Sequence, residues 1–395
     1  MRTVCVVTVG RSDWGLYLPI LQCLRAEPGM RLHLVAAGAH LAAGHGRTDA
    51  GILRDGFEIQ DRVPMLLAAD DAVSIAMSMG LGTIGFAQVY ERVRPDLLLV
   101  LGDRFEMHAA AAAAVPFRLP TAHVHGGEVT AGAIDDCFRH AITKYSHLHF
   151  ASTAEHGRRI VQLGEEPWRV TISGAPGLDH AGRVPLLSRD ELSARVGLTL
   201  TQSPVLVTQH PVTLQSERAG EQTDALLRAL DTVAGHPIVM TRPNADTRNT
   251  DILERLERFA ADRPHVRLVS NLGTQAYFSL MSQAAVMVGN SSSGIIEAAS
   301  FQLPVVNIGL RQEGRPRSGN VVDCDDSAAG IEAALKRALS AEFREYCLGV
   351  QNIYGDGHAA ARIVNVLRTV ELNERLLIKR FVDCEGGLPE LSSPF

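Results

Sequence analysis

The sequence contains only six cysteines among 395 residues, and no two of them form a Cys-x-x-Cys pair. They are Cys5, Cys23, Cys137, Cys324, Cys347 and Cys384. Scattered cysteines argue against a disulfide framework and against a structural zinc site. We therefore expect reduced thiols, no bound metal and a cytoplasmic location.

Long apolar runs and an excess of positive charge are also missing, and we expect no signal peptide. The longest uninterrupted apolar run, Ala109–Val115, falls well short of the roughly 20 apolar residues that a membrane span requires. The apolar run near the start ends at Gly10, too early for a signal peptide. The net charge of −6 argues against nucleic acid or an anionic membrane as a partner. We expect a soluble protein that binds a small ligand.

Short apolar runs alternate with helical segments in both halves of the chain. Five consecutive apolar residues at Leu97–Leu101 predict a strand buried on both faces, and Glu106–Val115 predicts the helix after it. The alternation restarts at the strand Pro204–Thr208. This pattern favours parallel sheets, so we predict an α/β fold of two Rossmann-like domains with a central cleft. We place the domains at residues 1–180 and 181–372, followed by a poorly ordered tail at residues 373–395.

The clearest functional signal is the turn Gly289–Gly294, which reads Gly-Asn-Ser-Ser-Ser-Gly between a strand and a helix that begins near Ile295. The first turn of a helix has unpaired N–H groups, and serine hydroxyls beside them complete an anion site. Glu297 could accept hydrogen bonds from ribose hydroxyls. Alternatively, one serine is only the helix cap and Glu297 its capping-box partner. The three serines are Ser291, Ser292 and Ser293.

Two further loops carry acids and bases at the ends of strands, where open parallel sheets bind their ligands. The first follows Leu97–Leu101 and contains Asp103, a candidate acid or base, and Arg104, a candidate phosphate ligand. The alternative for this loop is a surface ion pair at the start of the next helix. The second loop, His123–Glu128, follows the next strand.

The helix after His123–Glu128 extends this second group. Asp136, Arg139 and His140 stand at positions i, i+3 and i+4 and therefore share one helix face. The two histidines of the His-x-His pair, His123 and His125, lack a third ligand at typical metal spacing. We therefore take the candidates His125, Glu128, Asp136 and Arg139 as acid–base or sugar-binding residues.

Single residues in other loops complete the candidate site. His210 follows the strand Pro204–Thr208, and Arg311 follows the last predicted strand. Arg11 lies after the first strand, in a loop without the Gly-x-Gly-x-x-Gly fingerprint, so we expect no nicotinamide or flavin cofactor, and indeed no cofactor. Asn244 is counted with the candidate substrate-binding residues.

Taken together, these loops resemble the UDP-N-acetylglucosamine 2-epimerase family, in its bacterial hydrolysing branch. The resemblance runs from about Val4 to Val370 and rests on the stretches VTVGRSDWG, LGDRFE, HVHGGEVTAGAIDDCFRHAITK, TQHPVT, VGNSSSGIIEA and NIGLRQEGRPR. It implies the two-domain GT-B fold of many glycosyltransferases, with UDP held mainly by the C-terminal domain. It also implies a homo-oligomer, a dimer or tetramer.

The resemblance implies roles for individual residues. Those implied to contact the nucleotide are Arg11, Ser291, Ser292, Glu297 and Arg311. Those implied to transfer protons or assist the leaving group are Asp103, Glu128, Asp136 and His210, with Arg104 and Arg139 nearby. Non-hydrolysing members have glutamate at the position of His125, a difference that favours the hydrolysing branch.

The implied reaction converts UDP-N-acetylglucosamine and water into N-acetylmannosamine and UDP through 2-acetamidoglucal, a step of sialic acid type pathways. A second possible substrate is UDP-N,N'-diacetylbacillosamine, of the legionaminic acid pathway, towards which the GAIDD and APGLD stretches lean. A glycosyltransferase and a non-catalytic nucleotide-sugar sensor would have the same fold, and fold alone does not separate them from an epimerase.

Overall fold

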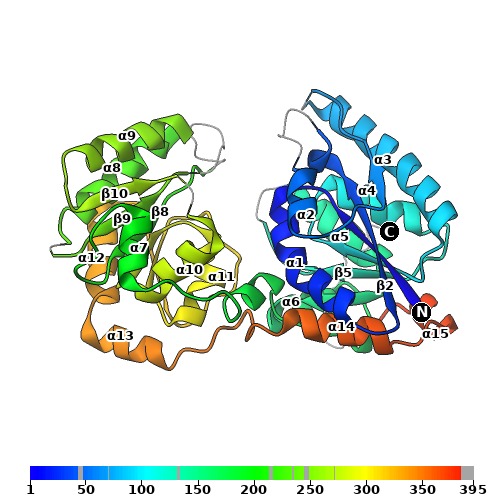
Figure 1. Cartoon of the computed structure of the whole chain (residues 1–395). Helices are drawn as coiled ribbons and strands as arrows, with labels where there is room; N and C mark the ends of the chain where they lie inside the picture. The colour runs from blue at the N-terminus through cyan, green and yellow to red at the C-terminus, as the bar shows by residue number, and fades with distance from the viewer. Residues whose placement is uncertain are drawn as a thin grey trace, which may run out of the picture. The chain divides into compact units, whose positions relative to one another are not determined.

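The computed structural model describes residues 1–42, 48–69, 71–130, 134–212, 217–233, 235–243, 249–270 and 272–383. The chain divides into two compact units, each built around one parallel sheet (Figure 1). Unit 1 comprises Met1–Asp179 and Gly357–Phe395, and unit 2 comprises His180–Asp356. The predicted α/β fold with two parallel sheets is confirmed.

The sheet of unit 1 has seven strands in the order β3-β2-β1-β4-β5-β6-β7. The strands are β1 Arg2–Thr8, β2 Met30–Ala37, β3 Asp61–Val63, β4 Leu97–Leu101, β5 Thr121–Val124, β6 Leu148–Ala151 and β7 Val170–Ile172. The helices are α1 Arg11–Ala26, α2 Asp49–Arg54, α3 Ala72–Val93, α4 Phe105–Ala114, α5 Asp135–Tyr145, α6 Ala154–Gln162, α14 Ala359–Thr369 and α15 Glu374–Leu377. All five residues of β4 are buried, as predicted for a central parallel strand.

The sheet of unit 2 has six strands in the order β10-β9-β8-β11-β12-β13. The strands are β8 Val205–Thr208, β9 Ile238–Thr241, β10 Val266–Val269, β11 Val286–Gly289, β12 Val305–Ile308 and β13 Val321–Cys324. The helices are α7 Arg189–Val196, α8 Ala219–Leu230, α9 Asn249–Ala261, α10 Gly273–Gln283, α11 Ser292–Ile296, α12 Ala328–Ala338 and α13 Ala341–Leu348. Strand order reverses between β1 and β4 in unit 1 and between β8 and β11 in unit 2, and ligand crevices form at such switch points.

The C-terminal segment differs from the prediction that assigned residues 181–372 to one domain and the rest to a tail. Helix α14 packs against α1, and its Ile363 and Leu367 belong to the core of unit 1. The N–H groups of Ala359 and Ala360 donate to the buried carboxylate of Asp179, at 2.9 and 2.8 Å. These apolar and capping contacts explain why residues from 357 onward join unit 1 instead of unit 2.

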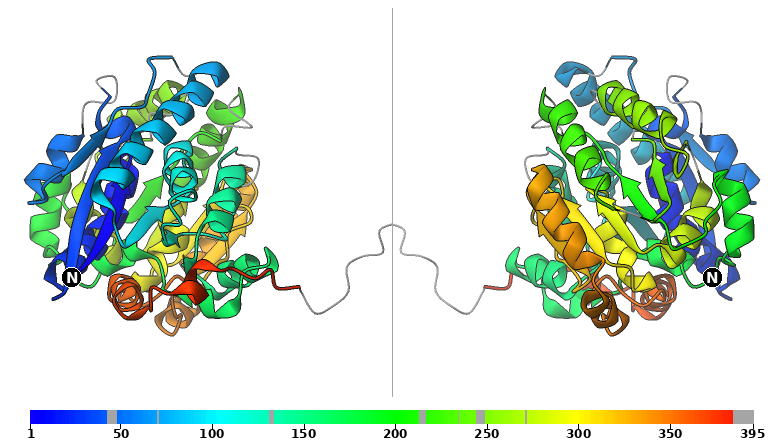
Figure 2. Two further views of the ribbon diagram at one scale, coloured as in Figure 1. Left: turned by 90° about the vertical axis from the view of Figure 1, so that its right-hand side faces the viewer. Right: turned by 90° about the vertical axis from the view of Figure 1, so that its left-hand side faces the viewer.

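Residues 373–383 are also more ordered than predicted. The fully buried Arg169 side chain donates to the backbone carbonyls of Arg375, Leu376 and Ile378. Arg2 donates to three carbonyls at the end of α14, so the start of β1 lies beside this segment (Figures 1 and 2). Arginine donors thus satisfy the last carbonyls of α14 and α15.

Helix α3 is a second departure from prediction. It is 22 residues long and, by length and composition alone, apolar enough to cross a membrane, although only 22% of its most apolar window is buried. The sequence contains no uninterrupted apolar run there because serine, glycine and threonine punctuate it. One face packs on α4 through residues such as Phe86 and Tyr90, and the other face is exposed.

Candidate functional site

In unit 1, the loops after β4 and β5 are joined by Arg139 of α5. Its guanidinium donates to Oδ2 of Asp103, to Oδ1 of Asp136 and, at 2.8 Å, to the backbone carbonyl of Glu128. The Arg139 side chain is only 4% exposed, so its buried charge requires these carboxylates as partners. The structure therefore brings together four residues predicted from the sequence: Asp103, Glu128, Asp136 and Arg139.

Asp135 and Asp136 are neighbours in sequence with different environments. Besides Arg139, the Asp136 carboxylate accepts from the N–H of Thr130 at 3.0 and 3.1 Å, so it holds the preceding loop. Burial and the nearby charge of Asp103 raise the pKa of Asp135. A carboxyl with a raised pKa suits a general acid. The sequence predicts a role for Asp136 through its helix spacing with Arg139, and that spacing does not include Asp135.

Glu128 lies in a second cluster, between the ends of β5 and β6. Its Oε1 accepts from Nδ1 of His125 at 2.6 Å and from the hydroxyl of Ser152 at 2.7 Å. Burial alone would raise the pKa of Glu128, but the charge and hydrogen bond of His125 outweigh it and lower this pKa well below its ordinary value. His125 has a φ of +65°, which is rare for a residue with a side chain. Such strain is typical of functional loops.

Arg104 is less available to phosphate than expected. Its guanidinium donates to both oxygens of Glu106, at 3.0 and 3.2 Å, and Glu106 is fully buried. Arg104 therefore forms an ion pair at the start of the next helix, which was the alternative to phosphate binding for this loop. The Arg104 side chain is nevertheless 45% exposed.

The loop after β1 is organised by a residue that sequence reasoning missed. Buried Asp13 accepts from the N–H groups of Val9 and Gly10 at 2.8 and 2.7 Å, and from the Thr8 hydroxyl at 2.8 Å. Arg11 begins α1 and its side chain is exposed. Asp13 thus fixes the backbone from which Arg11 projects.

In unit 2, Asn290 ties together the loops that follow three adjacent strands. Its side chain bonds to the N–H of His210 at 2.8 Å and to the carbonyl of His210 at 2.9 Å. Its own carbonyl accepts from Arg311 at 3.1 Å and from Gln312 at 2.8 Å. Burial and the charge of Arg311 lower the pKa of His210 to about 4. The structure thus groups two predicted residues, His210 and Arg311, around one that was not predicted.

The serine turn requires glycine at its first position. Gly289 has a φ of +133°, and a Cβ there would lie 2.0 Å from the carbonyl oxygen of Thr208. The Ser291 hydroxyl accepts from the N–H of Ser293 at 3.3 Å and caps α11. The alternative of a simple helix cap is therefore right for Ser291. Ser292 and Ser293 remain candidates for an anion.

The helix after the turn is shorter and begins earlier than predicted. Helix α11 has five residues, and a 3-10 segment, Ala298–Phe301, follows it, where one helix from Ile295 to Ser300 was expected. A short helix has a small dipole. The N–H groups, hydroxyls and Arg311 are therefore the stronger candidates for holding an anion.

Glu297 lies at the end of α11 and makes no capping box with Ser291. Its Oε2 is buried and has no hydrogen-bond partner among the described residues. Burial raises the pKa of Glu297 to about 7. A buried carboxylate oxygen of this kind can accept hydrogen bonds from ligand hydroxyls, and the contact with ribose expected from the sequence stays a prediction. Tyr277 on α10 shares this environment: burial raises its pKa, and hydrogen bonds with Ser293, Thr208 and Ser291 oppose the rise.

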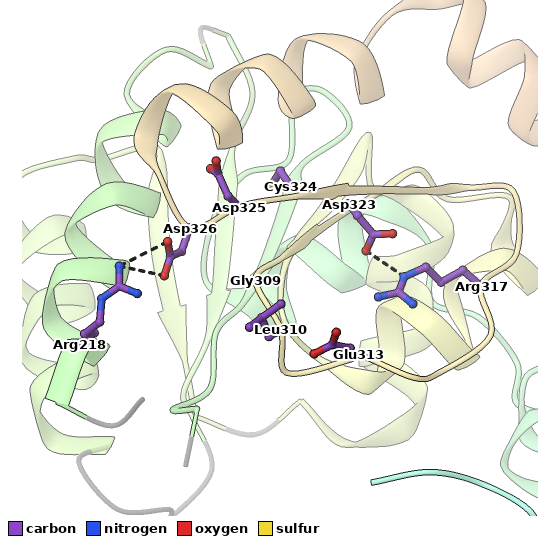
Figure 3. A pocket seen from close by; sticks show the side chains of 9 residues that line it. All are labelled: Arg218, Gly309, Leu310, Glu313, Arg317, Asp323, Cys324, Asp325 and Asp326. Atoms are coloured by element: carbon purple, nitrogen blue, oxygen red, sulfur yellow. Dashed lines mark hydrogen bonds and ion pairs between the residues drawn. The ribbon is translucent and has the colours of Figure 1, made fainter. Parts of the chain in front are cut away.

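Figure 3 shows a pocket of about 630 Å³ at the carboxyl ends of β12 and β13 in unit 2. Its two arginines are paired with acids, Arg218 with Asp326 at 3.3 Å and Arg317 with Asp323 at 2.8 Å. Asp325 and Glu313 add further negative charge to the lining. An acidic lining of this kind disfavours a diphosphate.

Other expectations fall partly outside the described residues. Asn244 lies outside them, as does Cys384. The five cysteines within the described ranges are free. In the same ranges, no group of three or more histidine, cysteine, aspartate or glutamate side chains is arranged to hold a metal ion.

Nearly the whole chain is similar to known proteins. The UDP-N-acetylglucosamine 2-epimerase family model matches residues 22–368. The GDP/UDP-N,N'-diacetylbacillosamine 2-epimerase (hydrolyzing) of Campylobacter jejuni is 35% identical, over 97% of this chain and 99% of the relative. The UDP-N,N'-diacetylbacillosamine 2-epimerase (hydrolyzing) of Legionella pneumophila is 36% identical, over 96% and 99%.

Solved structures agree on the fold. The UDP-GlcNAc 2-epimerase of Neisseria meningitidis, solved with UDP-GlcNAc bound, matches 94% of this chain and 100% of its own with a TM-score of 0.79 and 16% identity. The resemblance inferred from the loop motifs is confirmed, and this chain belongs to the UDP-N-acetylglucosamine 2-epimerase family.

Proposed function

We propose that this enzyme is a hydrolysing 2-epimerase that converts a UDP-linked 2-acetamido sugar and water into UDP and the free sugar inverted at C2. Two relatives that the chain matches over 99% of their length are named hydrolysing 2-epimerases. The observation that carries the proposal is the buried Arg139, which holds Asp103, Asp136 and the backbone of Glu128 at one edge of a sheet. Proton chemistry at C2 requires such clustered carboxylates.

The chemistry explains why the nucleotide must leave during the reaction. No carbonyl neighbours C2, so a side-chain base cannot remove its proton unaided. Cleavage of the C1–O bond to UDP builds positive charge at C1 and acidifies the C2 proton. A carboxylate takes that proton, the C–H electron pair forms the C1–C2 double bond, and UDP departs with the C1–O pair. A protonated carboxyl then delivers a proton to the face of C2 opposite the one that lost it, and water adds its oxygen to C1 and gives one proton to a carboxylate.

We assign these steps to residues in each unit. In unit 1, Asp103 and Glu128 exchange protons with C2, and Asp135, whose pKa is raised, is a third carboxyl for the protonated role. In unit 2, the residues proposed to hold UDP are Ser292, Ser293, Glu297 and Arg311. Donors around the departing diphosphate stabilise its developing charge.

The identity of the sugar in the substrate is a separate part of the proposal. Two relatives that are 35% and 36% identical are named for N,N'-diacetylbacillosamine. The Neisseria meningitidis relative named UDP-N-acetylglucosamine 2-epimerase is 30% identical over 86% of this chain. We therefore propose UDP-N,N'-diacetylbacillosamine as the first candidate substrate and UDP-N-acetylglucosamine as the second. The ratio of the two kcat/KM values decides between them.

Incubation with each UDP-sugar in deuterated water tests the reaction. Free sugar carrying deuterium at C2, together with UDP, is the expected result. A UDP-sugar epimer that stays intact would contradict hydrolysis, and transfer to an added acceptor sugar would indicate a glycosyltransferase. Asp103→Asn should abolish C2 exchange. Asp96→Asn is the matched control, because Asp96 precedes β4 and accepts from the backbone N–H of Thr3 at the opposite end of that strand.

We also propose that the protein is a homo-oligomer that assembles through α3. Four large apolar side chains on this helix are exposed: Val73, Met77, Leu81 and Ile84. Their spacing of three or four residues places them on one face. No charged residue occurs between Asp71 and Glu91. Exposed apolar stripes of this kind mark interaction sites.

We propose a second copy of the chain as the partner, because an uncharged apolar stripe is complementary to itself. Asp71 caps the start of the helix, and the two arginines at its end, Arg92 and Arg94, are paired with Asp61 and Glu91 of the same chain. In an antiparallel pair about a two-fold axis, the apolar stripe of one helix faces that of the other. A dimer by sedimentation is expected, and Leu81→Glu should dissociate it, whereas Leu348→Glu, exposed in unit 2, should not. A monomeric wild type, or one that pellets with liposomes, would contradict this assembly.

A cytoplasmic location is likewise a proposal. The free state of the described cysteines supports it. Cell fractionation tests it.

A further inference from the structure

We infer that Ser152 and His156 are positioning residues that hold Glu128 in its reactive orientation, an inference that rests on the proposed function of Glu128. Neither residue belongs to the loops that carry the family resemblance. Ser152 follows β6, and His156 stands in the first turn of α6. Both are buried, with 1% exposure each.

The contacts form a chain that ends at the carboxylate. The Ser152 hydroxyl donates to Oε1 of Glu128 at 2.7 Å and contacts Nδ1 of His156 at 2.8 Å. A hydroxyl has one hydrogen, and here the carboxylate receives it. His156 must therefore carry its own hydrogen on Nδ1 and donate it to Ser152. Burial lowers the pKa of His156 to about 4, so the ring is neutral at physiological pH.

Two hydrogen-bond donors contact the same carboxylate oxygen of Glu128. His125 Nδ1 and the Ser152 hydroxyl both donate to Oε1. Because each donor approaches from a different element, together they fix the rotation of the carboxylate about its last bond. Oε2 is left as the oxygen free of these two donors. The geometry assigns proton exchange with the substrate to Oε2.

The backbone around Glu128 is held by hydrogen bonds that do not involve Ser152 or the His156 side chain. Arg139 donates to the carbonyl of Glu128, and Arg159 of α6 donates to the carbonyl of Gly127. Gly127 passes so close to α6 that a Cβ there would lie 2.2 Å from the carbonyl oxygen of His156. Loss of Ser152 or His156 should therefore leave the loop in place and release only the side chain.

Paired substitutions at His156 give a specific test. An asparagine amide nitrogen occupies about the position of Nδ1, whereas a glutamine nitrogen occupies about that of Nε2. His156→Asn should keep near wild-type kcat, and His156→Gln and Ser152→Ala should lower kcat on the order of tenfold to a hundredfold with little change in KM. Ser173→Ala is the control, because Ser173 is buried after the neighbouring strand β7 and its hydroxyl donates to backbone carbonyls.

A second readout does not depend on turnover. The His125 Nδ1–H that faces Glu128 at 2.6 Å should give a downfield proton resonance. Ser152→Ala should move this resonance, and Ser173→Ala should not. An unmoved resonance with unchanged kcat, or equal losses in His156→Asn and His156→Gln, would overturn the inference. A wild type that releases no UDP, but whose resonance responds as described, would refute the proposed function and leave the positioning intact.

Discussion

The side-chain amide of Asn290 is bonded on both sides to the backbone of His210, at 2.8 Å to its N–H and 2.9 Å to its carbonyl. The two residues stand 80 positions apart and are both buried. This pair of hydrogen bonds fixes the loop after β8 against the serine turn after β11. The position of His210 therefore depends on a residue that need not touch the substrate.

Asn290→Asp should impair catalysis more than folding. Aspartate keeps the acceptor for the His210 N–H but replaces the donor to its carbonyl with an oxygen, so two acceptors face each other. We expect destabilisation of about 1–3 kcal/mol and a clear fall in kcat. Thermal melting and steady-state kinetics measure both. Asn320→Asp, which loses a comparable buried bond to the carbonyl of Leu303, is the control and should lower stability alone.

Arg139→Met should abolish activity. It removes the charge that bridges Asp103 and Asp136, and leaves both carboxylates without their buried counter-charge. Removing one partner of a buried ion pair costs about 3–5 kcal/mol. Arg139→Lys should also fail, since one ammonium cannot reproduce contacts made by both terminal nitrogens. Wild-type turnover in the lysine variant would contradict the bridging role.

Affinity for UDP should rise with pH through about 7, where the raised pKa of free Glu297 lies. Below that pH the carboxyl is protonated, and ribose hydroxyls that need an acceptor bind less well. Above it, the carboxylate is ionised and affinity levels off. Calorimetric titration between pH 6 and pH 8, a range chosen to lie about one unit either side, measures the dependence. Glu297→Gln should remove it, leaving only the titration of UDP itself.

Ionisation of Glu297 should lower the stability of the fold, although it should raise the affinity for UDP. Because its pKa is raised in the folded protein, the protonated carboxyl favours folding at low pH, and this contribution is lost as pH rises through about 7. Glu297→Gln should therefore gain stability relative to wild type mainly above that pH. An equal difference at all pH values would argue that Glu297 titrates normally.

Gly127→Ala should be strongly destabilising. Gly127 has a φ of +75°, and an added Cβ would clash with the carbonyl of His156 at 2.2 Å. Gly29 has a φ of +84° and open space around it, so Gly29→Ala isolates the backbone cost, about 1 kcal/mol. In urea unfolding, the loss in free energy of unfolding should be several-fold larger for Gly127→Ala than for Gly29→Ala. Equal effects would show that the loop can move away from α6.

The local pattern of apolar and polar residues was enough to predict the parallel sheets and the loops that follow their strands. Apolar runs such as Leu97–Leu101 identify buried parallel strands, and the loops after them carry the candidate acids and bases. Helix α3 escaped prediction because its serines and glycines interrupt any apolar run. The docking of α14 on unit 1 escaped as well, because an amphipathic helix does not specify which core it covers.

The sequence by itself determined the family, the fold class and which loops hold the chemistry, because these depend on short motifs and on periodicity. Only the tertiary structure decided how the side chains are paired. Arg104 is bonded to Glu106, Ser291 is used as a cap, and Arg139 joins Asp103 to Asp136. Ser152 reaches Glu128 from another strand, 24 positions away. The pairings of Arg139 with Asp103 and of Ser152 with Glu128 arise because the sheet brings distant strand ends together, and nothing in the neighbouring residues encodes them. The pairings of Arg104 and Ser291 are local, and there the sequence offered both a ligand-binding and a structural role.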